Sequence, residues 1–369
     1  MLGTYFSWPF GPGSRDNQKP GWVPLAICLL LSGCDSLRYY GQLAQGQFTL
    51  LRAREPVERV ISASDTPEAL RQRLAVALQA RAFASEHLQL PDNRSYRLYA
   101  DVHRPFVVWN VFATDEFSLQ AVTHCFPIAG CVAYRGYYDQ GAARGAAALL
   151  RQQNQDVYVS GVETYSTLGW FDDPIISTMA RWGDERLATL IFHELAHQRY
   201  YVKNDTQFNE SYATFVEQEG TRQWRAWRGL PVQPMAQARQ RDQFVQLVLD
   251  TRERLAQLYR QPMPATAMRT AKQAEFERLR KQYRQLRDTQ WGGQGVYDAW
   301  VDSPLNNAKL LPFGLYDQWV PAFARLFEQQ GRDWPRFFTA VAQLGALPQA
   351  QREAQLAALM PPATNAVVH

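Results

Sequence analysis

The sequence lacks several features that define particular classes of protein. Its 39 basic and 35 acidic residues are interspersed and leave a formal net charge of only +4, so no concentrated basic surface points to nucleic acid as a partner. It has no apolar run of the about 20 residues that a membrane-spanning helix needs. It also has no repeat of fixed period and no low-complexity tract, which argues against solenoids and propellers.

Hydrophobic residues nevertheless make up 46% of the 369 residues, and charged residues only 20%. This balance is typical of a folded chain and excludes wholesale disorder. The length is enough for one large domain or about two. Histidine and cysteine are scarce, with six and four residues, so the position of each one is informative.

The N-terminal region predicts export. Residues 1–21 are polar, include two basic side chains and lead into a short apolar run over residues 22–31, which is typical of a signal peptide. The run ends in L-S-G-C at residues 31–34, which resembles a bacterial lipobox. This resemblance implies a lipoprotein signal peptide over residues 1–33 and acylation of Cys34. An ordinary cleaved signal and a buried apolar helix are the alternatives.

Acyl chains on Cys34 anchor a protein to a membrane without spanning it, here in the bacterial cell envelope and facing the periplasm. By resemblance to enterobacterial lipoproteins, Asp35 favours the inner membrane. Apart from Cys28 within the signal and the acylated Cys34, the remaining cysteines are Cys125 and Cys131, and we expect them to form a disulfide in this oxidising compartment. The alternative, in which they bind a metal with His124, conflicts with their spacing, which is longer than in a zinc knuckle.

The pattern along the chain predicts an α+β fold. Stretches rich in Val, Phe, Trp and Tyr are typical of strands and occur within residues 104–138 and at 156–162. Apolar periodicity predicts helices at residues 66–88, 140–153, 184–201 and 206–228, with Asp184 and Asp205 as caps of the last two. A helical hairpin is expected at 235–260 and 266–290, followed by mostly helix from residue 297.

The segment that carries chemistry is L-I-F-H-E-L-A-H-Q at residues 190–198, which contains H-E-x-x-H. On a helix, positions i and i+4 lie about 40° apart around the axis, so His193 and His197 project from one face and can share a tetrahedral zinc ion. Glu194 lies about 100° further round and can reach a water molecule on the metal without binding the ion. Such a site hydrolyses bonds, because zinc lowers the pKa of water towards about 7 and the carboxylate accepts its proton.

A catalytic zinc site needs a third protein ligand, and Glu210 on the following helix is the candidate. Glu217 and Glu219 are alternatives. Glu217 lies about two helical turns, or 10 Å, beyond Glu210, so the two cannot bind one ion from a straight helix. Glu217 is therefore expected in solvent or in support of a ligand histidine, a role open to Thr214 as well.

These residues carry a resemblance to known enzymes. H-E-L-A-H followed by F-N-E-S-Y-A is similar to the gluzincin metallopeptidases, whose third ligand is a Glu in an Asn-Glu-x-x-Ala segment, and this assigns that role to Glu210. The spacing is shorter than in thermolysin-like enzymes, and Thr214 stands where those have Asp. Nearly the whole chain from Cys34 resembles the putative aminopeptidase family of bacterial lipoproteins, through V-V-W-N-V-F, C-F-P-I-A-G-C-V-A-Y-R-G-Y-Y, Y-S-T-L-G-W-F-D-D-P-I and the motifs above.

The resemblance implies a zincin-like metallopeptidase core with a small mixed sheet and active-site helices in residues 34–230, followed by a mostly helical region in residues 231–369. It implies one Zn²⁺ ion, a peptide substrate and Glu194 as the general base. The tetrahedral intermediate also needs a donor for its oxyanion. Tyr165 is favoured, because its segment precedes the active-site helix, and the other candidates are Tyr200, Tyr201, Tyr212 and Arg199.

The sequence leaves more than one function open. The leading hypothesis is a membrane-anchored zinc aminopeptidase, which also needs an anion for the free α-amino group of its substrate, and the nearby acids are Glu163, Asp172 and Asp173. The first alternative is a zinc endopeptidase that processes proteins. The second is a non-catalytic metal-containing lipoprotein scaffold, in which Glu194 has no purpose. Nucleic acid is not expected as a partner, and the oligomeric state is not indicated.

Overall fold

The computed structural model describes residues 29–126, 130–164, 166–231, 236–313 and 318–361. Within these ranges the chain is α+β, as predicted, with small sheets in its first half and a helical C-terminal region. None of the helices in these ranges combines the length and the hydrophobicity that crossing a membrane requires. The expected signal peptide lies mostly outside the described residues.

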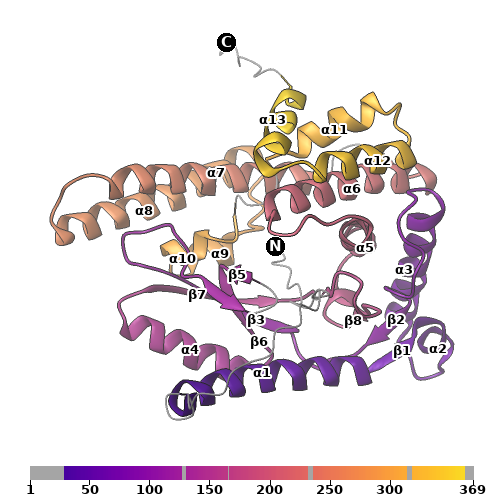
Figure 1. Cartoon of the computed structure of the whole chain (residues 1–369), viewed down its shortest axis with the longest axis horizontal. Helices are drawn as coiled ribbons and strands as arrows, with labels where there is room; N and C mark the ends of the chain where they lie inside the picture. The colour runs from indigo at the N-terminus through magenta and orange to yellow at the C-terminus, as the bar shows by residue number, and fades with distance from the viewer. Residues whose placement is uncertain (1–28, 127–129, 165, 232–235, 314–317, 362–369) are drawn as a thin grey trace, which may run out of the picture.

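Three small sheets form the β part of the molecule (Figure 1). The first is mixed, with strands in the order β1 (Arg54–Pro56), β2 (Leu98–Ala100) and β8 (Ile175–Ile176). The second is antiparallel, in the order β6 (Tyr134–Tyr137), β3 (Val108–Thr114) and β7 (Asp156–Val162). The third is the hairpin of β4 (His124–Phe126) and β5 (Gly130–Val132). The stretches rich in Val, Phe, Trp and Tyr therefore form sheets of only two or three strands.

Helices precede and surround these sheets. Those of the first half are α1 (Leu29–Arg52), α2 (Val57–Ser62), α3 (Glu68–Glu86) and α4 (Gln140–Gln152). A 3-10 turn at Met179–Arg181 leads to α5 (Asp184–Arg199) and α6 (Thr206–Trp227). The remaining helices are α7 (Ala236–Tyr259), α8 (Ala265–Gln290), α9 (Asp298–Asp302), α10 (Asn307–Leu310), α11 (Val320–Gln329), α12 (Trp334–Gly345) and α13 (Gln349–Leu359).

The central strand β3 is covered on both faces. All of its residues are buried. Val111 belongs to the main core with the inner face of α4, whereas its neighbour Phe112 packs on Ala308 and Leu311 from the other side. Double burial explains why this strand reads as an almost continuous apolar run and not as a clean alternation.

Two large hydrophobic cores divide the helices of the described residues, besides the small cluster around Phe112. The main core joins α3, α5, α6 and the sheets to α11–α13. A second core lies within the α7–α8 hairpin and the segment that follows it, around Phe244, Phe276 and Tyr283, and this hairpin extends away from the rest of the molecule (Figure 1). The predicted region 231–369 therefore contributes its side chains to both cores.

Helix α1 packs directly against the antiparallel sheet. The backbone N–H of Tyr138 donates to Gln42 Oε1 at 2.9 Å, and the ring of Tyr39 lies 5.6 Å from that of Tyr137. Gly46 allows this approach, because a Cβ atom there would lie only 2.1 Å from the Tyr138 ring. The segment directly after Cys34 is thus part of the folded body.

The β4–β5 hairpin contains Cys125 and Cys131, the two cysteines expected to form a disulfide. Its ladder places Cys125 opposite Cys131, and Cys125 is disulfide-bonded.

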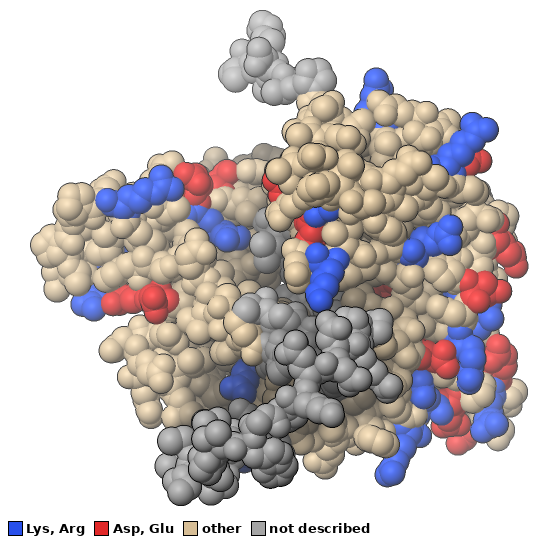
Figure 2. Space-filling view, in the orientation of Figure 1, with Lys and Arg blue, Asp and Glu red and all other residues tan. Residues whose placement is uncertain are grey.

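Surface charge is mixed over the face seen in Figure 2, where basic and acidic side chains lie interspersed along the edge formed by α2 and α3. Ion pairs account for part of this pattern, such as Arg97 with Asp92 at 2.5 Å and Arg73 with Asp184 at 2.9 Å. This edge forms no patch of one sign.

Candidate metal centre

Helix α5 presents the H-E-x-x-H motif to the interior. Residues 187–188 and 190–197 are buried, so this helix lies in the core with its histidines facing α6. The expected cap at Asp184 is wrong: Gly183 occupies the cap position, and no side chain caps the helix. Asp184 lies in the first turn and pairs with Arg73 of α3, where its negative charge still favours the N-terminal end of the helix.

Helix α6 begins at the predicted cap. Asp205 Oδ1 accepts a hydrogen bond from the backbone N–H of Phe208 at 3.0 Å, and its other oxygen accepts from Arg352 Nη2 of α13 at 2.6 Å. Further along α6, Gly220 lets the two helices approach closely, because a Cβ atom there would lie 3.2 Å from the Phe192 ring. These contacts set the position of Glu210, one turn into α6.

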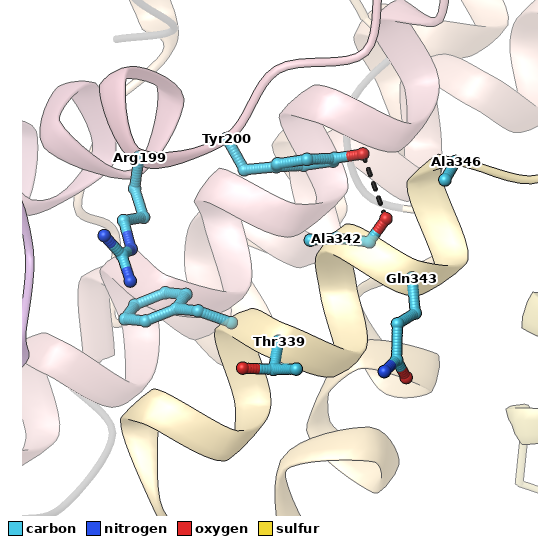
Figure 3. Close-up of a pocket in the computed structure, with 7 residues that line it drawn as sticks. Arg199, Tyr200, Thr339, Ala342, Gln343 and Ala346 are labelled. Carbon is cyan, nitrogen blue, oxygen red and sulfur yellow. Dashed lines mark hydrogen bonds between the residues drawn. The ribbon is translucent and has the colours of Figure 1, made fainter.

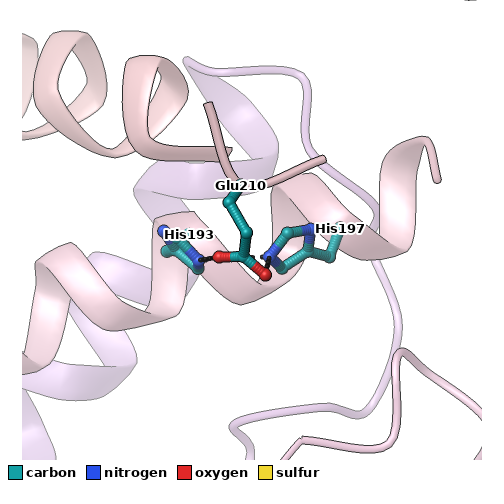
Figure 4. A group of neighbouring side chains, drawn as sticks. All are labelled: His193, His197 and Glu210. Carbon is teal, nitrogen blue, oxygen red and sulfur yellow. Dashed lines mark hydrogen bonds and ion pairs between the residues drawn. The ribbon is translucent and has the colours of Figure 1, made fainter. Parts of the chain in front are cut away.

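Two histidines and a glutamate converge between α5 and α6 (Figure 4). His193 Nε2 lies 3.1 Å from His197 Nε2, and the Glu210 carboxylate lies 3.4 Å from His193 Nε2 and 3.6 Å from His197 Nε2. A tetrahedral zinc ion with bonds of about 2.0–2.1 Å separates its ligand atoms by about 3.3 Å. The distances in the cluster therefore fit such an ion, and so does the donor set.

The cluster offers two imidazole nitrogens and a carboxylate, which suit a cation. His193 Nδ1 lies 2.8 Å from Glu217 Oε2, so with a cation bound this nitrogen would carry the proton and Nε2 would offer its lone pair. Glu217 therefore lies where it can support His193, one of the two positions expected for it. His197 Nδ1 is buried and finds no hydrogen-bond partner among the described residues.

The charges within the cluster shift its titration. Burial lowers the pKa of His193, but hydrogen bonds and charge from Glu210 and Glu217 outweigh it and raise the pKa to about 10. Burial raises the pKa of Glu210, but the two histidines outweigh that effect and lower it to about 2. The ionised form of the buried Glu210 carboxyl group is favoured by neighbouring positive charge, as expected for a residue at a cation site.

Glu194 lies beside the cluster and is only 2% exposed. Its Oε1 atom is buried and accepts no hydrogen bond from the described residues. Burial raises the pKa of Glu194, while the two histidines and a hydrogen bond with Ser166 act in the opposite direction. An inward-facing carboxyl group with an unused oxygen is suited to proton transfer.

Comparison with known proteins agrees with this arrangement. A model of one protein family, described as "Putative aminopeptidase", matches residues 38–356. The chain belongs to this family. No curated protein and no solved structure matches the chain. The matched residues include all of α5 and α6, and the family description suggests an aminopeptidase, with which a cluster able to bind a metal is compatible.

Most of the residues expected as oxyanion donors lie away from the cluster. Tyr165 falls outside the described residues. Tyr200 donates its hydroxyl to the carbonyl oxygen of Ala342 at 3.2 Å, and it lines a pocket of about 510 Å³ against α12 that includes neither the cluster nor Glu194 (Figure 3). Arg199 lies over the Phe338 ring in the same pocket. Tyr212 is fully buried against α11 and α12.

Two tyrosines do lie at the cluster. Tyr201, one of the expected candidates, has its ring 6.1 Å from that of His197, and partial burial and the charge of Glu210 raise its pKa. Tyr134 was not a candidate from sequence. Burial raises its pKa, and the charges of Glu210 and Tyr201 raise it further, so Tyr134, in strand β6, lies within electrostatic reach of the cluster. Its place in the aromatic segment C-V-A-Y-R-G-Y-Y was the available signal.

The acids expected to bind an α-amino group are engaged in other contacts. Glu163 accepts from Trp182 Nε1 at 3.1 Å and from Arg186 Nη2 at 3.3 Å. Asp172 pairs with Arg94 at 3.5 Å, and Asp173 is only 1% exposed. Another expected alternative, Glu219, is held by Arg222 at 2.6 Å and does not belong to the cluster.

Proposed function

We propose that this protein is a zinc-dependent aminopeptidase, anchored by lipid on Cys34 to a membrane of the bacterial envelope and facing the periplasm. The observation that carries the proposal is the convergence of donor atoms from His193, His197 and Glu210 within 4.8 Å of one another, beside the buried carboxyl group of Glu194. Membership of an aminopeptidase family agrees with it.

The three residues suit one zinc ion, because two imidazoles and a carboxylate are a donor set of catalytic zinc sites. When bound, the ion supplies Lewis acidity that acidifies water and polarises the scissile carbonyl group. A structural zinc site is closed by four protein ligands. Three ligands, with the carboxyl group of Glu194 beside them and not among them, therefore favour a catalytic site over a structural one.

Glu194 is proposed as the general base and acid. Its carboxylate accepts a proton from the attacking water and returns that proton to the amine that leaves. Because burial raises its pKa, the protonated form is stabilised at the stage when the proton must be held. The side chain reaches the site from the same helix as the two histidines, so its position is fixed with theirs.

The phenols of Tyr134 and Tyr201 are proposed to donate hydrogen bonds to the oxyanion. Both lie close enough to Glu210 for its charge to raise their pKa values, and they come from different parts of the fold, Tyr134 from β6 and Tyr201 from the segment that follows α5. Tyr165 stays a prediction for the same role.

The test uses the full chain purified in detergent. We expect about one equivalent of zinc in the wild type and in Glu194→Gln, with hydrolysis of free aminoacyl substrates by the wild type only. The variant should lose at least about a hundredfold in kcat, as removal of a general base does. Glu219→Gln is the matched control, because Glu219 lies outside the cluster and pairs with Arg222, and it should keep full activity.

Other outcomes separate the alternatives. Hydrolysis of N-blocked peptides assigns the protein as an endopeptidase. Bound metal without turnover of any peptide rejects catalysis and favours the scaffold. Absence of metal from the wild type rejects the site itself.

Anchoring has a separate test. Cys34→Ser should move the protein from the membrane fraction to the soluble periplasmic fraction, and a protein that stays with the membrane rejects the lipid anchor. We also propose that the disulfide of Cys125 is formed with Cys131, its partner in the β4–β5 ladder. Mass spectrometry of a non-reduced digest tests this pairing.

A further inference from the structure

A second buried carboxyl group lies close to Glu194. Asp173, in the segment between β7 and α5, is only 1% exposed. Its carboxylate accepts hydrogen bonds from Thr167, from the hydroxyl at 2.7 Å and from the backbone N–H at 3.0 Å. These bonds close the turn at residues 166–169 around the Asp173 side chain.

Among the described residues, the nearby positive charges of Arg54 and Arg94 bind Asp172 and not Asp173. No lysine, arginine or histidine of the described ranges forms an ion pair with it, and the groups that face it from other elements are neutral: Gln198 Nε2 of α5 at 3.5 Å and the Ser95 hydroxyl, which accepts from the Asp173 backbone N–H at 3.3 Å. The one charged group is Glu194. Burial raises the pKa of Asp173 to about 7, opposed by the Thr167 hydrogen bonds and assisted by the charge of Glu194.

Ser166 connects the two carboxyl groups. Its hydroxyl donates to Asp173 Oδ2 at 3.4 Å, and the same side chain forms the hydrogen bond that lowers the pKa of Glu194. The Ser166 oxygen also accepts from the backbone N–H of Leu168 at 3.2 Å. A serine hydroxyl has one proton, so Ser166 can donate to only one of the two carboxyl groups at a time.

We propose that Asp173 is a positioning residue for the general base Glu194 and acts through the hydroxyl proton of Ser166. This role rests on the proposed peptidase function. It assigns a task to a buried carboxyl group that the hydrolytic step itself does not use.

The hydrogen bonds from Asp173 through Ser166 to Glu194 can form without transfer of a proton between these residues. With Asp173 protonated, its O–H donates to the Ser166 oxygen, and Ser166 donates to the carboxylate of Glu194. The Ser166 oxygen then accepts from both Asp173 and Leu168 N–H, which fills its lone pairs. With Asp173 ionised, its carboxylate accepts the hydrogen bond of the Ser166 hydroxyl, and Glu194 loses the donor that orients it.

The kinetic test compares pH profiles of the full chain. In the wild type, kcat should fall as pH rises through the ionisation of Asp173. In Asp173→Asn the amide N–H₂ donates to Ser166 at every pH, so this step should vanish while activity below pH 6 is kept. Ser166→Ala should lower kcat about tenfold, as expected for a lost hydrogen bond to a charged group, with KM nearly unchanged.

Two controls make the comparison specific. Asp172→Asn changes the neighbouring carboxylate, which pairs with Arg94 at the surface, and should keep the wild-type profile. In the Ser166→Ala background, Asp173→Asn should have no further effect on the profile, because the connection is already broken.

A measurement on the metal-free chain needs no activity. Asp173 has a raised pKa in the folded state, so the folded chain binds an extra proton between the ordinary pKa of 3.8 and about 7, and stability from this group falls as pH rises across that window. With a chelator present, the melting temperature of Asp173→Asn minus that of the wild type should therefore increase from pH 4 to pH 7. Glu194 is present in both proteins, so its own contribution largely cancels.

The failures are distinguishable. A wild type that hydrolyses no peptide rejects the proposed function and this role of Asp173 with it. An active wild type whose pH profile is unchanged in Asp173→Asn rejects the role of Asp173 alone. A difference in melting temperature that stays constant from pH 4 to pH 7 shows that Asp173 holds no proton in the fold and also rejects it.

Discussion

At the scale of the residue, single side chains decide how the cluster would hold the proposed zinc ion, and Glu217 is the clearest case. Its carboxylate accepts from His193 Nδ1 at 2.8 Å, which fixes the ring orientation and the tautomer. Loss of such a partner typically costs about 10–100-fold in metal affinity. We therefore expect Glu217→Ala to weaken zinc binding by that factor, measured by competition with a chromophoric chelator.

Glu219→Ala is the control for this prediction. Glu219 lies two residues further along α6 and is bonded to Arg222 and Gln223, so its removal should leave the zinc affinity unchanged. A Glu217→Ala variant that binds zinc as tightly as the wild type contradicts the role of Glu217.

The relative positions of site residues could be predicted from the sequence where the residues share one helix. His193, Glu194 and His197 are fixed relative to one another by α5, and the structure brings Glu210 to the two histidines from α6. Tyr134 was missed, because it reaches the cluster from a strand about 60 residues earlier in the chain. Only the tertiary fold brings it near the cluster, and local periodicity contains no such information.

At the scale of elements, helix α1 gives a sharp test of close packing. A Cβ atom on Gly46 would lie 2.1–2.5 Å from atoms of the Tyr138 ring, and Tyr138 is itself buried. Gly46→Ala should destabilise the fold by about 1–3 kcal/mol, the usual cost of overpacking. Unfolding of the full chain in denaturant measures this change.

Gly41 on the same helix is the matched control. A Cβ atom there meets nothing within 4 Å, so Gly41→Ala changes only helix propensity and should stabilise α1 by up to about 1 kcal/mol. Equal effects of the two substitutions would show that α1 does not pack on the sheet as described.

Elements were predicted well where the local pattern is strong. Strand β7 has the bounds expected from its sequence, and α5, α6 and the α7–α8 hairpin differ from expectation by at most two residues at each end. Helix α1 was not anticipated beyond its first residues. Gly41 and Gly46 lower its intrinsic helix propensity, and contact with β6 and Tyr138 supplies the stability that the local sequence lacks.

On the scale of the whole molecule, the C-terminal helices contact the beginning of α6, the helix that carries Glu210 of the candidate metal centre. Arg352 of α13 binds Asp205 with its Nε atom at 2.9 Å and also the carbonyl oxygens of Gly345 and Leu347. Asp205 caps the helix that carries Glu210. Helix α13 therefore contacts the residue that caps α6. The family match, which ends at residue 356, includes both residues of this contact.

The α7–α8 hairpin joins the rest of the protein through a buried ion pair. Lys272 Nζ of α8 lies 2.6 Å from Asp156 Oδ2 at the start of β7 and donates to the carbonyl oxygen of Glu116 at 2.7 Å. The same Asp156 oxygen accepts from the backbone N–H of Asn307 at 2.8 Å. One carboxylate thus connects the second core to the sheet of the first.

Removal of that carboxylate tests whether the two cores unfold together. Asp156→Ala leaves the Lys272 ammonium group buried without its counter-ion, which typically costs about 3–5 kcal/mol, so the melting temperature should fall strongly. Lys272→Met in the same background should recover part of the loss, because the unpaired charge is then absent.

Arg269→Ala is the control. It breaks the exposed pair with Glu116 and should have little effect on the melting temperature, since exposed ion pairs contribute little to stability. Because none of these residues touches α5 or α6, zinc affinity of the folded protein should stay at the wild-type value in every variant, and a parallel loss of zinc would show that the hairpin helps to hold the metal centre.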